Sequence, residues 1–358
     1  MRTAAELAEP VNRRRWEALA ECAGEANPFA EHWALLPAIR ALGVERHVHF
    51  LCLEDDGILA GILPVSRWWR YYRYPLPHLA NWVHGNAFLG GPLIARDCEA
   101  LFWRKALAWA DENAGFSLFW HLTWLNLDGP AFAALRAVAD QQGRPFAVVQ
   151  SHERAMIEPG TCSTDKYWNA VLPTKKRKEL RRQRRRLEEE GTLIVERRGD
   201  DTAIESWIAE FLALEAAGWK GDSFALARER ATQRVFTETM RGAATRGRLD
   251  RLTLRLDGKP IAMLATLLDT PGAFAYKTAY DESYARFSPG VLLQQENLQL
   301  LDNGTISWCD SCAAEGHPMI DSLWRERRRI GRVNIGIGGA RRQAVYARLL
   351  ARETGASQ

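Results

Sequence analysis

The chain has 358 residues, and its hydrophobic content of 47% is enough to fill the cores of two ordinary domains. A net charge of +4 excludes a polycation, and six scattered cysteines are typical of reduced thiols rather than of a disulfide framework. Residues 1–15 are polar and no stretch reaches the ~20 apolar residues of a membrane span, so we expect a cytoplasmic protein without an export signal.

The predicted elements of the first part follow the order helix, hairpin, helix and strand. They are a helix at residues 27–36, strands at 50–53 and 58–65, a helix opened by residues 90–93 and ended by residues 113–115, and a strand at 116–120. The hairpin turns at Asp56 and Gly57, residue types that tolerate the positive φ of a tight turn.

A segment rich in Trp, Tyr, Arg, Pro and His, here called the aromatic loop, covers residues 68–91. Its length and content are unusual for an idle linker. It lines an acceptor groove or lies on a bilayer surface, because such a mixture suits an apolar boundary with a wet edge. The alternative is that these side chains form the core of the first domain.

A basic helix is predicted from Thr174 to Gly191, with the cations Lys175, Lys176, Arg177, Lys178, Arg181, Arg182, Arg184, Arg185 and Arg186. Its second half contains the i,i+4 pairs Arg184–Glu188, Arg185–Glu189 and Arg186–Glu190, which stabilise a helix in water. Two interpretations of the charge remain. Either the basic side chains are simply solvated, or the helix contacts phosphates of a ligand or of an anionic membrane surface. Nucleic acid is not the expected partner, because no recognition fold accompanies the charge.

The order helix, hairpin, helix and strand then returns. Its members are a helix at residues 204–217, strands at 251–256 and 261–268, a helix opened by residues 288–291 and ended by residues 303–304, and a strand at 305–308. The second hairpin again turns at an Asp-Gly pair, Asp257 and Gly258. This duplication predicts two related α/β domains with a groove between them.

Glu215 lies on the second of these helices beside Phe211, Leu212 and Leu214. A carboxylate against an apolar wall has a raised pKa and takes a proton from an amine near neutral pH. Glu215 is therefore a candidate general base. The alternative is a salt bridge to Lys220 or an exposed helix position.

Residues 288–290, Ser-Pro-Gly, are predicted to open a helix over residues 291–298. A helix N-terminus offers free N–H groups and a partial positive charge, which together suit a phosphate. Arg286 stands just before it and could reach a second phosphate. The alternative is an ordinary helix start with Ser288 as the cap and Pro289 in the first turn.

The segment from Cys309 to Cys312, followed by His317, is spaced like a zinc knuckle, but Ser322 stands where the fourth ligand is needed. No metal is expected. Residues 305–309 are instead predicted to form a buried strand with Asp310, Cys312 and His317 at its mouth. His317 is then an alternative to Glu215 as proton acceptor, and Cys312 is either an acyl-bearing nucleophile or an inert buried thiol.

Residues 175–186, 214–221 and 276–290 together resemble the double-domain GNAT-type acyltransferases. The chain is most similar to the group named for cellulose-biosynthesis and BioF2-like acetyltransferases, whose wider relatives include Fem-type transferases. The resemblance spans roughly residues 27–330 and is specific only over residues 175–290.

The resemblance implies an α/β fold of two tandem GNAT-like domains, each with a mixed central sheet flanked by helices. It implies an acceptor-side domain at residues 1–155, an acyl-CoA-binding domain at residues 156–340, and a C-terminal helix or tail at residues 341–358. In GNAT-like folds the coenzyme A pyrophosphate rests on a loop that corresponds here to Arg286, Phe287, Ser288, Pro289, Gly290 and Val291. The usual loop contains more glycine.

The reaction implied is N-acylation of an amine acceptor by acyl-CoA, without a metal. The candidate catalytic residues are Glu215, His317, Asp310, Tyr280, Tyr284 and Lys277. Glu215 or His317 takes the proton of the amine, backbone N–H groups hold the oxyanion, and a tyrosine phenol protonates the departing thiolate. Core packing is the alternative role for either tyrosine.

Some bacterial ceramide synthases resemble this group, so the expected acceptor is a lipid-like, sphingoid-type amine at the inner membrane surface or an amino sugar of the cell envelope. The alternatives are an aminoacyl-tRNA-dependent, Fem-like transferase and a non-catalytic module that binds an anionic ligand.

Overall fold

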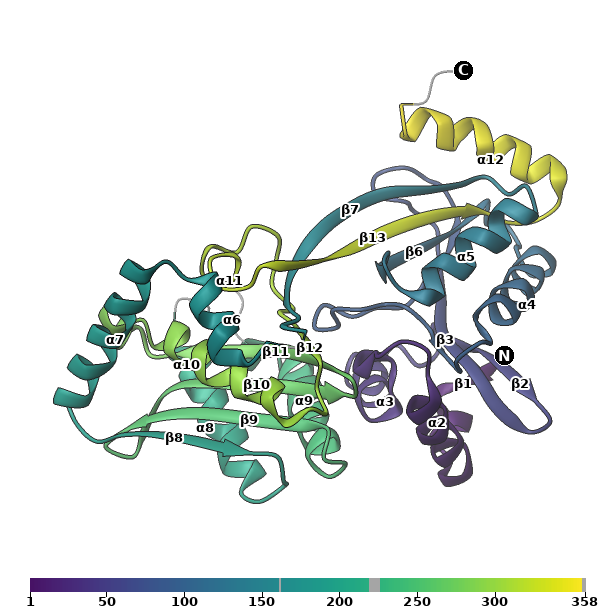
Figure 1. Cartoon of the computed structure of the whole chain (residues 1–358). Coiled ribbons are helices and arrows are strands. Elements are labelled where there is room, and N and C mark those ends of the chain that lie inside the picture. The colour runs from purple at the N-terminus through teal and green to yellow at the C-terminus, as the bar shows by residue number, and fades with distance from the viewer. Residues whose placement is uncertain (161, 219–225, 356–358) are drawn as a thin grey trace. The chain divides into compact units, whose positions relative to one another are not determined.

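The computed structural model describes residues 1–160, 162–218 and 226–355, which form two compact units (Figure 1). The first unit consists of Met1–Glu153 together with the segment that begins at Arg328, and the second is Arg154–Arg327. The first boundary lies close to the expected one at residue 155. The second differs, because residues 328–340, which were expected in the second domain, belong to the first unit.

The sheet of the first unit has the strand order β1-β2-β3-β4-β6-β13-β7, with β5 beside β3. Its strands are β1 (Arg2–Thr3), β2 (His49–Asp55), β3 (Ile58–Trp68), β4 (His78–Asn81), β5 (Leu93–Ile94), β6 (Phe119–Asn126), β7 (Phe146–Ile157) and β13 (Glu326–Gly336). β2, β3 and β4 pair antiparallel, whereas β4 and β6 pair in parallel.

The helices of the first unit are α1 (Ala4–Leu7), α2 (Pro10–Cys22), η1 (Pro28–Ala30), α3 (His32–Ala41), α4 (Glu99–Glu112), α5 (Pro130–Gln141) and α12 (Ala340–Glu353). α4 and α5 share one core with the sheet, where the rings of Trp103 and Trp120 meet edge to face at 6.1 Å. The Trp103 indole N–H also donates to the carbonyl of Ala131 (2.8 Å), which ties α4 to α5. The buried Trp103 thus keeps its polar atom satisfied.

The sheet of the second unit has the strand order β7-β12-β11-β10-β9-β8. The strands not yet named are β8 (Leu193–Arg198), β9 (Leu249–Leu256), β10 (Lys259–Asp269), β11 (Gly272–Tyr280) and β12 (Trp308–Asp310). β9, β10 and β11 pair antiparallel, and β11 pairs in parallel with β12. The series β9, β10, β11, β12 therefore repeats the pairing of β2, β3, β4, β6, as the duplication in the sequence predicts.

The helices of the second unit are α6 (Thr164–Val171), α7 (Thr174–Glu189), α8 (Ile204–Ala217), η3 (Leu226–Arg228), α9 (Arg230–Ala244), η4 (Glu282–Phe287), α10 (Pro289–Asn297), η5 (Leu298–Asn303) and α11 (Pro318–Asp321). Leu252 and Leu254 of β9 lie in one core with α6, α7 and α10. The other sheet face holds an aromatic row in which Phe211 of α8, Phe236 of α9 and Tyr276 of β11 stack. Because strand side chains alternate between faces, both faces of this sheet are covered.

Both predicted hairpin turns are confirmed. Asp56 and Gly57 have φ of 45° and 78°, and Asp257 and Gly258 have φ of 49° and 78°. Two consecutive positive φ values define the turn whose twist matches antiparallel strands, and Asp-Gly adopts it at low cost. The helix predicted at residues 204–217 is α8, with these same bounds.

Several boundaries differ from the prediction. The helix expected at residues 27–36 is η1 followed by α3, which runs to Ala41, and the strand expected at residues 116–120 is β6, which begins at Phe119. Residues 90–93 do not open a helix but lead into β5, and α4 begins only at Glu99. β4 lies inside the predicted aromatic loop, because a four-residue strand is too short to show a period of two. β12 begins at Trp308 rather than at Thr305. In the described part of the chain, no helix combines the length and apolar character that crossing a bilayer requires.

Candidate functional site

The site of the second unit starts where β11 and β12 separate. The two strands pair over three residues, from Gly272 opposite Trp308 to Phe274 opposite Asp310. The approach is close, since a Cβ on Gly272 would lie 2.3 Å from the Trp308 ring. β12 ends at Asp310, whereas β11 runs on to Tyr280. The edge of β11 beyond Phe274 is thus no longer paired with β12.

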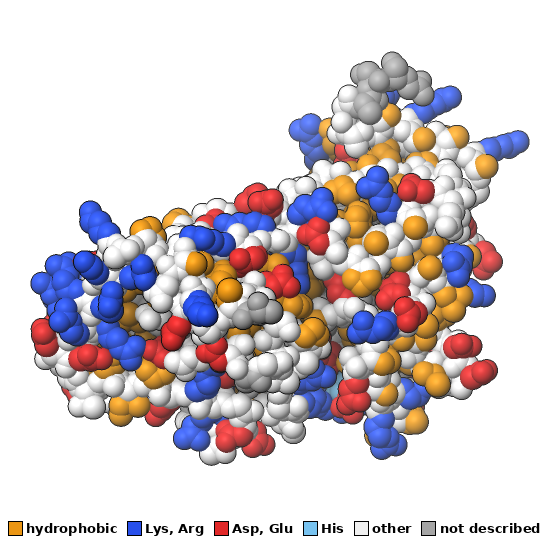
Figure 2. All heavy atoms as spheres, in the orientation of Figure 1, with side chains coloured by type: hydrophobic (Ala, Val, Ile, Leu, Met, Phe, Trp, Pro, Cys, Tyr) orange, Lys and Arg blue, Asp and Glu red, His pale blue; other side chains and the backbone are white. Residues whose placement is uncertain are grey.

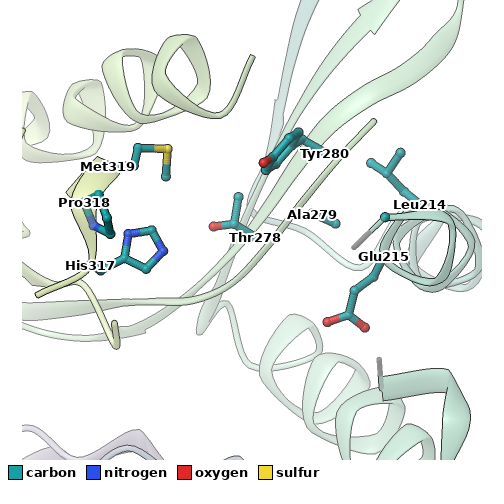
Figure 3. A pocket seen from close by; sticks show the side chains of 9 residues that line it. Leu214, Glu215, Thr278, Ala279, Tyr280, His317, Pro318 and Met319 are labelled. Carbon is teal, nitrogen blue, oxygen red and sulfur yellow. The ribbon is translucent and has the colours of Figure 1, made fainter. Parts of the chain in front are cut away.

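A cavity of about 340 Å3 lies beside this part of β11. Its walls come from α8, from the end of β11, and from the start of α11 with the residue before it: Leu214, Glu215, Gly218, Thr278, Ala279, Tyr280, His317, Pro318 and Met319. Figure 3 shows Glu215 and His317 on opposite sides, with Thr278 and Tyr280 between them. The volume falls in the range of small-molecule sites.

Glu215 is buried, with 4% of its surface exposed, and lies in the wall that α8 provides. Its Oε2 accepts the N–H of Leu226 (2.9 Å), which holds the carboxylate in place. The expected apolar surroundings are present, since Phe211, Leu212 and Leu214 are buried on the same helix. The alternative partner Lys220 lies outside the described residues. A buried carboxylate facing a cavity has the position that a proton acceptor needs.

His317 is half-buried and is the N-cap of α11. Its Nδ1 accepts the N–H of Ile320 at 3.4 Å, so the neutral ring carries its proton on Nε2. In that tautomer the nitrogen away from the helix is a donor. His317 is thus arranged to donate a hydrogen bond, and Glu215 to accept one.

Tyr280 lines the cavity from the last residue of β11, whereas Lys277 and Tyr284 are not among its lining residues. Lys277 Nζ lies 5.7 Å from the ring centroid of the buried Tyr276. The Tyr284 ring lies beside Lys259 and Phe287 and packs against the core of the second unit. Of these three sequence candidates, the structure brings only Tyr280 to the cavity.

Asp310 lies in the core rather than at the cavity wall. It is fully buried and forms an ion pair with the buried Arg154 (3.5 Å), while its Oδ1 accepts the N–H of Cys312 (2.8 Å). Burial raises the pKa of the Cys312 thiol well above its usual value, and Cys312 has a positive φ of 52°. A buried thiol that stays protonated is a poor nucleophile, so this geometry favours the structural interpretation of both residues.

The start of α10 adjoins the cavity. A Cβ on Gly290 would lie 3.3 Å from Met319 Sδ and 3.8 Å from Tyr280 Cδ1, and both of these residues line the cavity. Pro289 has no N–H, and Val291 and Leu292 donate theirs to the Ser288 carbonyl (2.9 and 3.1 Å). Pro289, Gly290 and Val291 are also buried. The first turn therefore presents fewer donors than a glycine-rich loop provides.

Ser288 does not cap α10 with its side chain, in contrast to the ordinary helix start considered above. Its backbone is left-handed, with φ of 53°, a conformation that costs a residue with a Cβ about 1 kcal/mol or more. Phe287 before it is buried in the core. The turn is thus held in shape by packing rather than by a cap.

Arg286 is exposed and pairs with Glu190 at the end of α7 (2.8 Å). Gln183 Nε2 of α7 donates to the Arg286 carbonyl (3.4 Å), so the basic helix lies along the segment before α10. Figure 2 shows the blue side chains gathered at the α7 end of this face. The cations lie within the second unit beside the expected phosphate turn.

α7 begins at Thr174, as expected, and Pro173 is its N-cap. The predicted pair Arg184–Glu188 is present (3.2 Å), and Arg184 also binds Glu296 of α10. Among the ion pairs of the described residues, Arg185–Glu189 and Arg186–Glu190 do not occur. Arg184 therefore connects α7 to α10, whereas its spacing in the sequence predicted only a pair within α7.

Sequence reasoning missed Thr278, Pro318 and Met319 as cavity residues. Thr278 lies two residues before Tyr280 on β11, and side chains two apart on a strand share a face. That spacing was a usable signal. The sequence gives no such signal for Pro318 and Met319, because their position depends on the path of the loop between β12 and α11.

Residues 174–323 match a family model described as "Acetyltransferase (GNAT) domain". This range lies within the second unit and contains every residue that lines the cavity. No curated protein matches the chain.

Solved structures with a similar fold cover nearly the whole chain. FemX has 10% sequence identity and a TM-score of 0.59 over 94% of this chain and 98% of its own. A C-terminal DUF2156 domain, assigned to a lysylphosphatidylglycerol synthetase of Agrobacterium fabrum, has 12% identity and a TM-score of 0.56 over 98% and 97%. A Bacteroides thetaiotaomicron VPI-5482 protein of unknown function has 12% identity and a TM-score of 0.56 over 91% and 97%.

At these identities the likeness concerns the fold alone. Together with the repeated strand pairing and the family match, it confirms the expected mixed α/β architecture of two GNAT-like units. The range that carries the acetyltransferase match is the range that carries the cavity.

Proposed function

We propose that the protein is an acyl-CoA-dependent N-acyltransferase and that the cavity beside β11 is where the acyl group meets an amine. The observation that carries this proposal is the placement of Glu215 and His317 on opposite walls of a cavity at the point where β11 and β12 separate. The acetyltransferase match over residues 174–323 supports it.

In the proposed reaction Glu215 accepts a proton from the amine. Its carboxylate has lone pairs for this task, while the Leu226 N–H on Oε2 keeps it oriented. His317 is the weaker candidate for a base, because the lone pair of its neutral ring already accepts the Ile320 N–H. The amine nitrogen then forms a bond to the thioester carbon, and the thiolate leaves.

The edge of β11 supplies the polar groups for the acyl end. Beyond Phe274 its backbone N–H and C=O groups run along the cavity without β12 beside them. Preorganised N–H donors stabilise an oxyanion better than water does. We assign protonation of the thiolate to the Nε2–H of His317 or to the phenol of Tyr280, because both residues line the cavity.

The start of α10 and Arg286 are proposed to hold the diphosphate of coenzyme A. Support comes from the contact of Gly290 with two residues of the cavity wall and from the exposed guanidinium of Arg286. With few N–H donors in the turn, more of the phosphate binding falls to cations. Arg286 must exchange Glu190 for a phosphate, which is a small cost for an exposed pair.

The proposed acceptor is a lipid-like, sphingoid-type amine or an amino sugar of the envelope. Exposed aromatic rings on the first unit support the lipid: Trp68 (54%), Trp69 (68%), Tyr72 (62%) and Tyr74 (49%). Rings of this kind favour the boundary between lipid and water. Flotation of the protein with anionic liposomes, compared with neutral ones, tests whether it associates with a membrane surface.

The direct test is an assay of acyl-CoA with different chain lengths against sphingosine and glucosamine. Binding is measured in parallel as the rise in melting temperature that coenzyme A causes. Arg286→Glu is expected to reduce that rise, whereas Arg230→Glu, an exposed cation on α9, leaves it unchanged. If neither acyl-CoA nor any other thioester raises the melting temperature, the protein is better interpreted as a non-catalytic module that binds an anionic ligand.

A second candidate is an aminoacyl-tRNA-dependent transfer, favoured by the exposed cations of α7. It predicts tRNA binding whose affinity falls steeply with salt and disappears when Lys175, Lys176 and Lys178 are changed to Gln together.

A further inference from the structure

A separate cavity of about 160 Å3 lies in the second unit between the first turns of α8 and the strands β8 and β9. It shares no lining residue with the cavity beside β11. Ala203 and Ser206 line it from α8, and Arg198 and Arg251 line it from the strands. Neither the proposed reaction nor the family match assigns it a role.

The N-terminus of α8 is uncapped. Its N-cap residue, Ala203, has no side-chain acceptor and adopts a left-handed backbone with φ of 55°. The N–H of Ile204 bonds to Asp201 and that of Trp207 to Ala203, but in the described chain the N–H groups of Glu205 and Ser206 meet no acceptor. A helix start with free N–H groups and a positive dipole end favours an anion.

Arg251 supplies the independent observation. Its side chain is 1% exposed, and its Nη2 donates to the carbonyls of Asp200 (2.8 Å) and Thr202 (2.9 Å) and to Asp200 Oδ1 (3.2 Å). Its Nε and Nη1 are also buried and meet no acceptor among the described residues. Buried donors of a charged group are costly to leave unpaired. These two atoms have almost no exposed surface, so a ligand accepts from them only when the side chain of Asp200 or of Arg251 moves.

The other charged side chains of the cavity are compatible with a bound anion. Glu196 and Glu210 both accept hydrogen bonds from Arg255, at 2.7 and 2.8 Å, so this guanidinium offsets one of their two negative charges. Arg198 is exposed at the rim. Asp200 is the nearest competitor for Arg251, and its side chain is 57% exposed. The side chain of Asp200 can therefore turn to water when a ligand enters.

We propose that this cavity binds a small oxyanion, a phosphate or a carboxylate, held by Arg251, Arg198 and the free N–H groups of α8. The ligand is compact, because 160 Å3 leaves space for the anionic group and few further atoms. Guanidinium matches the geometry of both phosphate and carboxylate, so the structure specifies their shared chemistry. The proposal goes beyond acyl transfer and does not depend on it.

The test is calorimetric titration of the full chain with inorganic phosphate and, separately, with acetate, at an ionic strength kept constant with NaCl. Binding of either anion is expected, and the tighter one identifies the source of the oxyanion. Arg198→Gln is expected to weaken binding about tenfold, since it removes one charged donor from the rim of a folded cavity. Arg341→Gln, an exposed arginine on α12, is the matched control.

An NMR titration of the unmodified protein keeps the test independent of any variant. The amide signals of Glu205 and Ser206 are expected to shift with phosphate or acetate and not with NaCl alone. The proposal is overturned if neither anion binds at ~10 mM. It is equally overturned if Arg198→Gln binds as well as Arg341→Gln, or if the two amides do not respond.

Discussion

At the scale of single residues, Glu215 is the side chain on which the proposed chemistry depends most. Glu215→Gln keeps the size of the side chain and its acceptor for the Leu226 N–H, but removes the proton acceptor. We expect kcat to fall by about 10²–10⁴-fold with little change in the affinity for acyl-CoA. Steady-state kinetics with acyl-CoA varied at saturating amine measure both quantities.

The matched control is Glu238→Gln on α9, where the carboxylate forms a surface pair with Arg241. It should retain kcat within about twofold. A Glu215→Gln enzyme with unchanged kcat would assign the proton transfer to another group, of which His317 is the next in the cavity.

Asp310 is expected to matter for stability and not for turnover. Asp310→Asn leaves Arg154 charged in the core with its ion-pair partner neutralised. Breaking a buried pair costs about 3–5 kcal/mol, so the free energy of unfolding in urea should fall by that amount. Folded Asp310→Asn protein should keep its kcat. A stable variant without activity would restore Asp310 to the reaction.

His121 makes the stability of the first unit depend on pH. Burial lowers the pKa of His121 to about 4, while the hydrogen bond with Asn334 (2.6 Å) opposes this change. The unfolded chain, with a pKa near 6.5, binds the proton first as pH falls. The contribution of His121 to the free energy of unfolding is therefore fully present above pH 6.5. About 3 kcal/mol of this contribution is lost as the pH falls from 6.5 to 4.

Urea unfolding of the wild type and His121→Gln at pH 7 and 4.5 checks this effect. Other groups titrate in the same range, so the quantity to compare is the difference between the two proteins, which should shrink at pH 4.5. An NMR titration that places the His121 pKa near 6.5 would refute it.

At the scale of elements, the close pairing of β11 with β12 fixes where the cavity begins. A methyl group at Gly272 would lie 2.3 Å from the Trp308 ring, so Gly272→Ala must displace the ring or the strand. Overpacking of this kind costs about 1–3 kcal/mol. Thermal unfolding should show the loss, together with weaker binding of acyl-CoA.

Gly85→Ala is the control for this prediction, since a Cβ there meets no atom within 4 Å and the backbone of Gly85 is not left-handed. Its melting temperature should match that of the wild type. If Gly272→Ala also unfolds like the wild type, β11 and β12 are not held together as tightly as their contact indicates.

The elements that sequence predicts well are those whose information is local. Asp56-Gly57 and Asp257-Gly258 each encode their own turn, and the apolar periodicity of residues 204–217 encodes α8. β4 was missed because its burial comes from β3 and β6 on either side, which four residues cannot reveal. β12 has only three residues, and for the same reason its predicted start at Thr305 is three residues too early.

The candidate site was predicted in part. Glu215, His317 and Tyr280 do line one cavity, although they lie on three separate elements. Asp310 was assigned to the strand mouth because its partner Arg154 lies far away in the sequence, and a charged residue after a buried strand resembles a reactive group. Long-range ion pairs of this kind leave no local pattern.

At the scale of the whole molecule, the duplication provides the organising principle. Each unit contains a hairpin, a third antiparallel strand and a fourth strand parallel to the third. The sequence shows this repeat because its turns are conspicuous. The sequence does not show that the chain contributes β13 and α12 to the first unit after completing the second. That contribution depends on the pairing of β13 with β6, which lie far apart in the sequence.

The measurement that tests the account most directly is a crystal structure of the protein with coenzyme A bound. The account predicts the pantetheine arm along the edge of β11 beyond Phe274, with the sulfur in the cavity between Glu215 and His317 and the diphosphate at Ser288, Gly290 and Arg286. Coenzyme A bound elsewhere, with this cavity empty and the start of α10 uncontacted, would contradict it.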